Sequence, residues 1–167
     1  MAEPSRSFRP QKILKLLVER EVDFVVIGGI AGTLHGSARA TYDLDITYAR
    51  DSSNLERLAG VLRDLEARLS GKNVPPDLPF QLDAETLRRG ANFTFATRLG
   101  RFDICGEPAG APPYERMRRA AVEMPYDEIR IPVASLDDLI AMKRAAGRVR
   151  DKADVAEYIA IGRLARE

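Results

Sequence analysis

The chain has 167 residues, 45% of them hydrophobic and 31% charged, a balance typical of a globular protein that buries a real core. Its formal net charge of +1 provides no global field toward nucleic acid or membrane, so any polyanion must be bound by a local patch. The single cysteine, Cys105, excludes an internal disulfide framework, and the chain shows neither a signal peptide nor an apolar run of about 18 residues. We therefore expect a cytoplasmic protein with no membrane partner.

The first half of the chain alternates helical and strand-like patterns. Apolar residues at helical spacing predict helices, and runs with a period of two predict strands. The start of the chain, ahead of Pro10, looks disordered. The expected elements are then a helix at Pro10–Arg20, a buried strand at Val22–Gly29, a short helix at Ile30–His35, a strand at Thr41–Arg50 and a helix at Asn54–Leu69 capped by Ser52 or Ser53.

The second half predicts strands followed by helices. After a proline-rich loop at 73–79, we expect strands at Thr86–Phe95, extended by the alternating run Ala91–Thr97, and at Leu99–Cys105, then a helix at Tyr114–Ala121, a strand at Glu128–Val133, a helix capped by Ser135 and a last helix at Asp151–Arg166. Pro132 places the strand at 128–133 at a sheet edge, because proline cannot donate to a ladder.

The order of these elements predicts an α/β or α+β fold, a small mixed sheet flanked by helices. We expect one domain, residues 1–167, with a core at about 10–133 and a C-terminal helical segment at about 134–167.

Two aspartates carry the strongest functional signal. Asp43 and Asp45 alternate with apolar residues, so both carboxylates lie on one face of a strand, about 7 Å apart. Like charges at that spacing are costly to bury without a counter-charge, and a divalent cation such as Mg²⁺ supplies one through oxygen ligands. The pair Gly28-Gly29 marks a tight strand-to-helix turn whose N–H groups can hold phosphate. Together these features indicate phosphoryl or nucleotidyl transfer.

Asp103 is the best candidate for a third carboxylate, which a metal-dependent transfer site usually needs. It lies in the middle of a predicted strand, where aspartate is disfavoured. If that strand pairs with the one carrying Asp43, all three acids share a face. The alternative is a structural ion pair between Asp103 and an arginine such as Arg101 or Arg39.

A basic cluster follows near the C-terminus. Five cations fall within ten residues: Lys143, Arg144, Arg148, Arg150 and Lys152. Lys143 lies close to the apolar face of its predicted helix, where a lysine either extends to solvent or finds an anion such as phosphate. The alternative is a solvated helix end that complements the helix dipole. Arg39, upstream of the aspartates, is predicted either to neutralise phosphate or to pair with Asp43.

These motifs resemble a known family. Ile27, Gly28-Gly29, a gap of thirteen residues and Asp43-Leu44-Asp45-Ile46 are similar to the pattern of the nucleotidyltransferase superfamily. More narrowly, GGIAGTLHGSARATYDLDI and SLDDLIAMKRAAGRVRDKADVAEY resemble the subgroup of AbiEii-type toxins and minimal nucleotidyltransferases.

The resemblance implies a role for each matching position. Gly28 and Gly29 shape the turn that holds the triphosphate of an NTP, and Asp43 and Asp45 bind Mg²⁺ or Mn²⁺. Asp103 takes the place of the third acid, which helps to activate the attacking hydroxyl. Lys143 reaches the triphosphate with Arg148 nearby, and either Asp151 or Asp154 is the downstream acid.

The resemblance also implies partners. The toxin-like subgroup suggests RNA, such as tRNA, as the acceptor, with a protein acceptor also open, and a cognate antitoxin. Two alternatives stay open: a non-catalytic binding module of the same fold, and an enzyme that nucleotidylates a small molecule such as an antibiotic.

Overall fold

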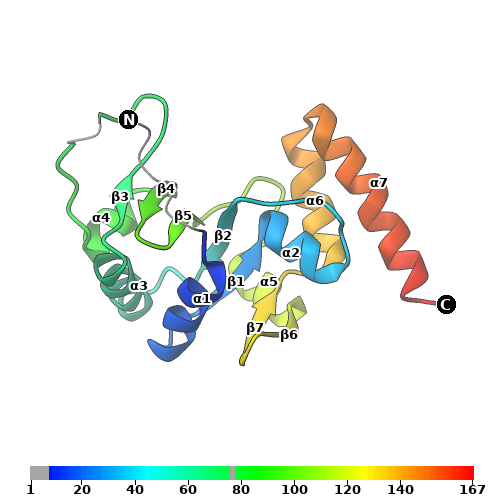
Figure 1. Ribbon diagram of the computed structural model, residues 1–167, viewed down its shortest axis with the longest axis horizontal. Helices are drawn as coiled ribbons and strands as arrows, with labels where there is room; N and C mark the ends of the chain where they lie inside the picture. Colours follow the sequence, from blue (N-terminus) through cyan, green and yellow to red (C-terminus); the bar gives the residue numbers. More distant parts are fainter. Residues whose placement is uncertain (1–7, 76–77) are drawn as a thin grey trace.

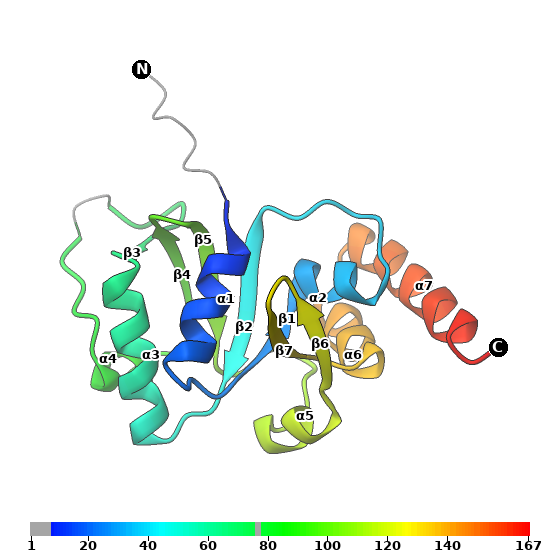
Figure 2. The same ribbon diagram turned by 60° about the horizontal axis from the view of Figure 1, so that its bottom comes forward.

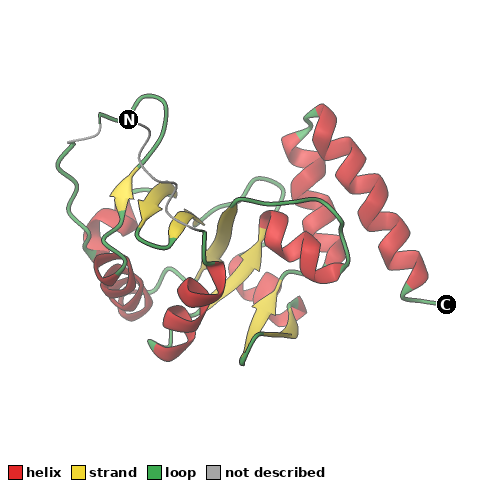
Figure 3. Ribbon diagram, in the orientation of Figure 1, coloured by secondary structure: helices red, strands yellow, loops and turns green. Residues whose placement is uncertain are grey.

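A seven-stranded mixed sheet crosses the computed structural model, which describes residues 8–75 and 78–167 (Figure 3). Residues 1–7, where a disordered start is expected, and residues 76–77 of the proline-rich loop lie outside the described part. The strands are β1 (Phe24–Ile27), β2 (Asp43–Tyr48), β3 (Arg68–Leu69), β4 (Asn92–Thr97), β5 (Gly100–Cys105), β6 (Val122–Tyr126) and β7 (Ile129–Val133). Their order is β3-β4-β5-β2-β1-β7-β6. The pairs β2–β5 and β1–β7 are parallel, and the other pairs are antiparallel.

Seven helices of the described residues surround this sheet, with α1 near its middle strands (Figures 1 and 2). They are α1 (Pro10–Glu19), α2 (Gly28–His35), α3 (Ser52–Asp64), α4 (Ala84–Arg89), α5 (Tyr114–Ala120), α6 (Leu136–Ala146) and α7 (Val149–Leu164). Helices α3 and α4 lie near β3 and β4, whereas α6 and α7 form a hairpin at the opposite end. Helix α2 packs on β1, β2 and α6. None of the helices in the described ranges is long and apolar enough to cross a membrane.

Alternation along the central strands separates the core from the candidate site. On β2, Leu44 and Ile46 are fully buried, and on β5 their partners Phe102 and Ile104 are buried as well. Because successive side chains of a strand point to opposite faces, the residues between them face the other side of the sheet. The aspartates are therefore placed by the same pattern that builds the core.

The predicted fold, a small mixed sheet flanked by helices, is confirmed. The predicted start of the strand at Thr86, however, is wrong. Residues 84–89 form the short helix α4, and the strand β4 begins only at Asn92. The carboxylate of Asp83 accepts the N–H of Thr86 at 2.8 Å and caps the helix, and Glu85 pairs with Arg88 and Arg89 one turn later. These local interactions favour helix over strand.

The helix expected at Asn54–Leu69 is shorter, and its cap is a different residue. Asp51, not Ser52 or Ser53, accepts the N–H of Asn54, at 3.2 Å. The helix ends at Asp64, and Arg68–Leu69 pairs with β4 as the short strand β3. The last helix likewise begins earlier than expected, at Val149.

The expectation that residues 128–133 form an edge strand is also wrong. Strand β7 lies between β1 and β6, and the sequence analysis did not predict β6. Pro132 is tolerated because the ladder to β1 does not need its missing N–H. That ladder is made at the strand end, where Val133 is opposite Val26 and the N–H of Ala134 donates to the carbonyl of Val26 at 2.9 Å.

Candidate active site

Three carboxylates converge on one face of β2 and β5. The parallel register puts Asp45 opposite Asp103 and Asp43 opposite Arg101. One carboxylate oxygen from each aspartate lies within 4.8 Å of the other two. The predicted pairing of these two strands, with the acids together, is thus confirmed.

Arg101 lies against the same cluster. Its Nε is 3.3 Å from Oδ1 of Asp103 and its Nη2 is 3.2 Å from Oδ2, so the guanidinium donates to both oxygens of one carboxylate. The same Nε is 3.9 Å from Oδ2 of Asp43. The acid cluster and the ion pair, which the sequence left as alternatives, therefore exist together.

The electrostatics show that the cluster lacks positive charge. Burial raises the pKa of Asp45 to about 8, with further increases from the carboxylates of Asp43 and Asp103, while Arg101 acts in the opposite direction. Burial also raises the pKa of Asp103, although the hydrogen bond from Arg101 lowers it. The one guanidinium does not offset three converging carboxylates, and a cation among their oxygens would.

The donor set fits a hard divalent cation. All three groups provide carboxylate oxygens from rigid strands. Their mutual separation of at most 4.8 Å is close enough that small side-chain adjustments would let one ion contact all of them at usual metal–oxygen distances of about 2.0–2.6 Å. Oxygen-only coordination suits Mg²⁺ or Mn²⁺. Asp43, Asp45 and Asp103 are the residues that would hold it.

The glycine pair is built against this cluster. Helix α2 begins at Gly28 itself, directly after β1, so the predicted turn is the first turn of the helix. A Cβ on Gly28 would lie 2.3 Å from Oδ2 of Asp45, and its φ of +71° also favours glycine. A Cβ on Gly29 would lie 2.7 Å from Oγ1 of Thr41. Both positions therefore need glycine, and the N-terminus of α2 lies beside Asp45.

The other predicted residues form a separate ion-pair cluster, which joins α6 to α7. Nζ of Lys143 is 3.3 Å from Oδ1 of Asp151 and 3.0 Å from Oδ2 of Asp154. Both carboxylates are buried, with side chains 0% and 5% exposed, whereas Lys143 is 20% exposed. Nε of Arg148 is 2.7 Å from Oδ2 of Asp151. The lysine therefore faces two anions and is not a solvated helix end.

Arg39 belongs to this second cluster. Its Nη1 is 3.2 Å from Oδ2 of Asp154, so Arg39 pairs with α7. The predicted alternative in which Arg39 pairs with Asp43 is therefore wrong. Because Arg39 precedes β2 by only a few residues, this pair ties the C-terminal hairpin to the segment that leads into the aspartates.

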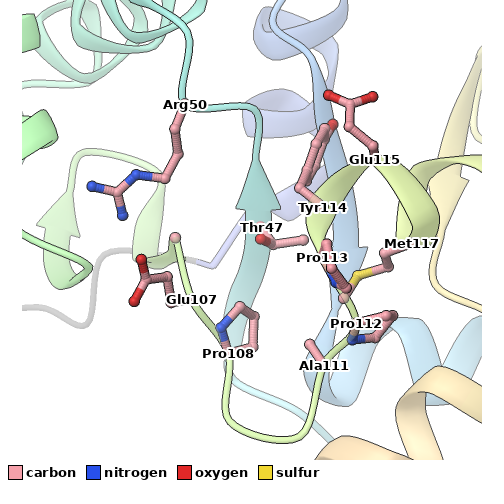
Figure 4. A pocket seen from close by; sticks show the side chains of 11 residues that line it. Thr47, Arg50, Glu107, Pro108, Ala111, Pro112, Pro113, Tyr114, Glu115 and Met117 are labelled. Atoms are coloured by element: carbon pink, nitrogen blue, oxygen red, sulfur yellow. The ribbon is translucent and has the colours of Figure 1, made fainter.

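A pocket of about 460 Å³ opens further along the same strands (Figure 4). Thr47 lines it, and its i, i+2, i+4 spacing from Asp43 and Asp45 puts it on the acidic face of β2. Arg50 and Glu107 line one side, and Tyr114 and Glu115 of α5 line the other. This pocket was not expected from the sequence. The spacing of Thr47 from the two aspartates could have placed it on the same face of the strand. The path of the loop at 106–113, which closes the pocket, cannot be predicted from local sequence patterns.

Comparisons with known proteins identify the family to which the chain belongs. The family model described as "Nucleotidyl transferase AbiEii toxin, Type IV TA system" matches residues 14–163, so the chain belongs to this family. No curated protein matches the chain.

Solved structures share this fold at low sequence identity. The lincomycin-bound lincosamide antibiotic adenylyltransferase LnuA superposes with a TM-score of 0.61 and 17% identity, over 91% of this chain and 95% of that one. TM1012 from Thermotoga maritima gives 0.56 and 16% over 92% and 95% of the two chains. ANT(2")-Ia in complex with adenylyl-2"-tobramycin gives 0.52 and 15% over 90% and 95%.

Proposed function

We propose that this protein transfers a nucleoside monophosphate from an NTP to an acceptor hydroxyl and releases pyrophosphate, with Mg²⁺ or Mn²⁺ as its cofactor. The convergence of Asp43, Asp45 and Asp103, with one oxygen of each within 4.8 Å, is the observation that carries the proposal. Family membership supports the same reaction class.

In the proposed reaction, the acceptor oxygen forms a bond to the α-phosphorus while the bond from that phosphorus to the pyrophosphate oxygen breaks. Asp103 accepts the proton of the attacking hydroxyl, a role supported by its place opposite Asp45 on the neighbouring strand. When bound, a divalent cation polarises the α-phosphate and stabilises the attacking and leaving oxygens. The chain itself contributes mainly positioning and charge.

The triphosphate would bind between the glycine turn and the C-terminal hairpin. Gly28 and Gly29 open the first turn of α2, where free N–H groups favour phosphate. Lys143 is the proposed cation for the triphosphate, with Arg148 and Arg39 nearby in the same ion-pair cluster. Because Asp151 and Asp154 both bind Lys143, either can act as the acid that orients it.

For the acceptor we propose RNA, such as tRNA, in the cytoplasm, with a cognate antitoxin as partner. The description of the family as the toxin of a type IV TA system supports the antitoxin. A small-molecule acceptor is the second candidate. The pocket beside the acidic face carries Glu107 and Glu115 against one Arg50, a charge balance that suits an uncharged or cationic molecule. The antibiotics bound by LnuA and ANT(2")-Ia favour the same candidate.

The test incubates the protein with each α-labelled NTP and Mg²⁺, together with total cellular RNA, cellular protein, lincomycin or tobramycin. We expect labelled product from the wild-type protein and at least about 10³-fold less from Asp45→Asn or with EDTA, because charge neutralisation at the cluster is lost. Where the label appears identifies the acceptor class. NTP binding without transfer to any acceptor would instead favour a non-catalytic module.

A further inference from the structure

We propose that Arg101 is the resident counter-ion of the three-aspartate cluster, and that it moves from the carboxylates to the phosphates when a metal–nucleotide complex binds. In this role Arg101 binds phosphate and makes metal binding depend on nucleotide binding. The inference rests on the proposed function for its physiological ligand, but its test needs no transfer reaction.

The backbone fixes Arg101 at the cluster. It lies opposite Asp43 across the parallel pair β2–β5 and two residues before Asp103 on its own strand. Side chains two apart on a strand share a face, so Arg101 projects on the same side of the sheet as the aspartates. The strand register, and not the free movement of a surface side chain, therefore sets the position of Arg101 beside the acids.

The contacts show that Arg101 uses the atoms a metal would need. Its guanidinium donates to both oxygens of Asp103, at 3.3 and 3.2 Å, and approaches Oδ2 of Asp43 at 3.9 Å. A divalent cation must take an oxygen from Asp103, and it would repel a guanidinium that stayed on the other. Metal alone therefore competes with Arg101.

Phosphate removes this competition. The Arg101 side chain is 56% exposed, so it has room to leave the carboxylates. A triphosphate at the cluster offers it oxygens in the forked geometry that a guanidinium prefers. Metal and phosphate should then strengthen each other's binding, and this coupling must be reciprocal.

The first experiment titrates Mn²⁺ calorimetrically into wild-type protein and Arg101→Gln, with and without inorganic tripolyphosphate at buffered free Mn²⁺. We expect Arg101→Gln to bind Mn²⁺ alone about tenfold more tightly, because the competing cation is gone. Tripolyphosphate should increase the Mn²⁺ affinity of the wild-type protein more than that of the variant. The matched control is Arg68→Gln, at an exposed arginine of the short strand β3, and it should leave both affinities unchanged.

The second experiment needs no metal. Thermal unfolding in EDTA is compared for Arg101→Gln, Asp103→Asn and the double variant. We expect Arg101→Gln to lower the Tm in the wild-type background. The effect should be smaller in the Asp103→Asn background, because one of the negative charges that Arg101 neutralises is already gone.

Equal or weaker Mn²⁺ binding by Arg101→Gln, or effects on Tm that simply add, would overturn the proposal. Wild-type protein that binds Mn²⁺ but labels no acceptor would instead contradict the proposed function and leave the role of Arg101 standing.

Discussion

At the scale of single residues, Asp45 is confined on three sides. Asp43 lies two residues away on its own strand, Asp103 is opposite it on β5, and the backbone of Gly28 packs against its Oδ2. The position of this carboxylate therefore depends on the absence of a side chain at residue 28.

Replacing Gly28 with alanine should disturb the cluster directly. The new Cβ would lie 2.3 Å from Oδ2 of Asp45, at a φ of +71° that alanine tolerates poorly. We expect a loss of about 2 kcal/mol in the free energy of unfolding and about tenfold weaker Mn²⁺ binding. Urea unfolding and calorimetry measure the two effects.

Gly60→Ala in α3 is the control for that substitution. Its Cβ would have no neighbour closer than 3.8 Å, so alanine should be neutral or slightly stabilising there. If Gly28→Ala matched Gly60→Ala in both assays, the close approach to Asp45 would have no energetic meaning.

At the scale of elements, the sequence predicts those parts of the molecule that depend on local periodicity. The alternation around Asp43 and Asp103 correctly places two strands with their acids outward, and Ser135 caps α6 by accepting the N–H of Asp138 at 3.1 Å, as expected. Strand β6 was missed because Pro125 interrupts a short run whose partner, β7, decides its structure.

A buried amide that was not expected from the sequence joins α3 to the segments beside β1 and β2. Asn54 of α3 is fully buried, its Oδ1 accepts the N–H of Asp23 at 2.7 Å, and its Nδ2 donates to the carbonyls of Asp23 and Ala49 at 3.0 and 2.7 Å. It thereby fixes the segments that flank β1 and β2. Nothing in the sequence around Asn54 distinguishes it from an ordinary polar residue in the first turn of a helix.

Asn54→Ala should therefore be among the costlier single substitutions. It leaves the N–H of Asp23 and the carbonyl of Ala49 without their bonds to Asn54, while the carbonyl of Asp23 keeps the N–H of Ala49 at 3.1 Å. We expect a loss of about 3 kcal/mol in the free energy of unfolding, measured in urea. Asn73→Ala, at an exposed loop position, should change it by less than about 0.5 kcal/mol. A small effect at Asn54 would mean that water replaces its bonds readily.

At the scale of the whole molecule, the C-terminal hairpin is fastened to the segment that leads into the site. Arg39 pairs with Asp154 at 3.2 Å, and the hydroxyl of Ser37 donates to Glu157 at 2.5 Å. A Cβ on Gly32 of α2 would lie 2.3 Å from the Tyr158 hydroxyl, so α7 packs directly on α2. These contacts join residues more than a hundred positions apart, which is why sequence motifs alone did not predict them.

The ion pairs of Asp151 make the stability of this assembly depend on pH. The hydrogen bond from Arg148 is the main cause that lowers the pKa of Asp151 from 3.8 to about 2. A carboxylate with a lowered pKa stabilises the folded state above the pKa it has when unfolded, and this contribution is lost as the pH falls through the folded value. The window for Asp151 is therefore about pH 4 to pH 2.

Asp151→Asn should lower the free energy of unfolding by about 3 kcal/mol at pH 7, because Lys143 loses one buried partner. The difference from wild type, followed by urea unfolding, should shrink between pH 4 and pH 2. The exposed Asp137→Asn serves as control and should show little difference at either pH. A gap for Asp151→Asn that stays constant down to pH 2 would contradict the role of its charge.

The most direct test of the proposed metal–nucleotide site is anomalous diffraction from crystals grown with Mn²⁺ and inorganic tripolyphosphate. We predict a Mn²⁺ peak bonded to oxygens of Asp43, Asp45 and Asp103, with the Arg101 guanidinium moved onto phosphate. Mn²⁺ bound elsewhere would contradict the proposed site. Arg101 still hydrogen-bonded to Asp103 at saturating metal and tripolyphosphate would contradict the proposed movement of its guanidinium.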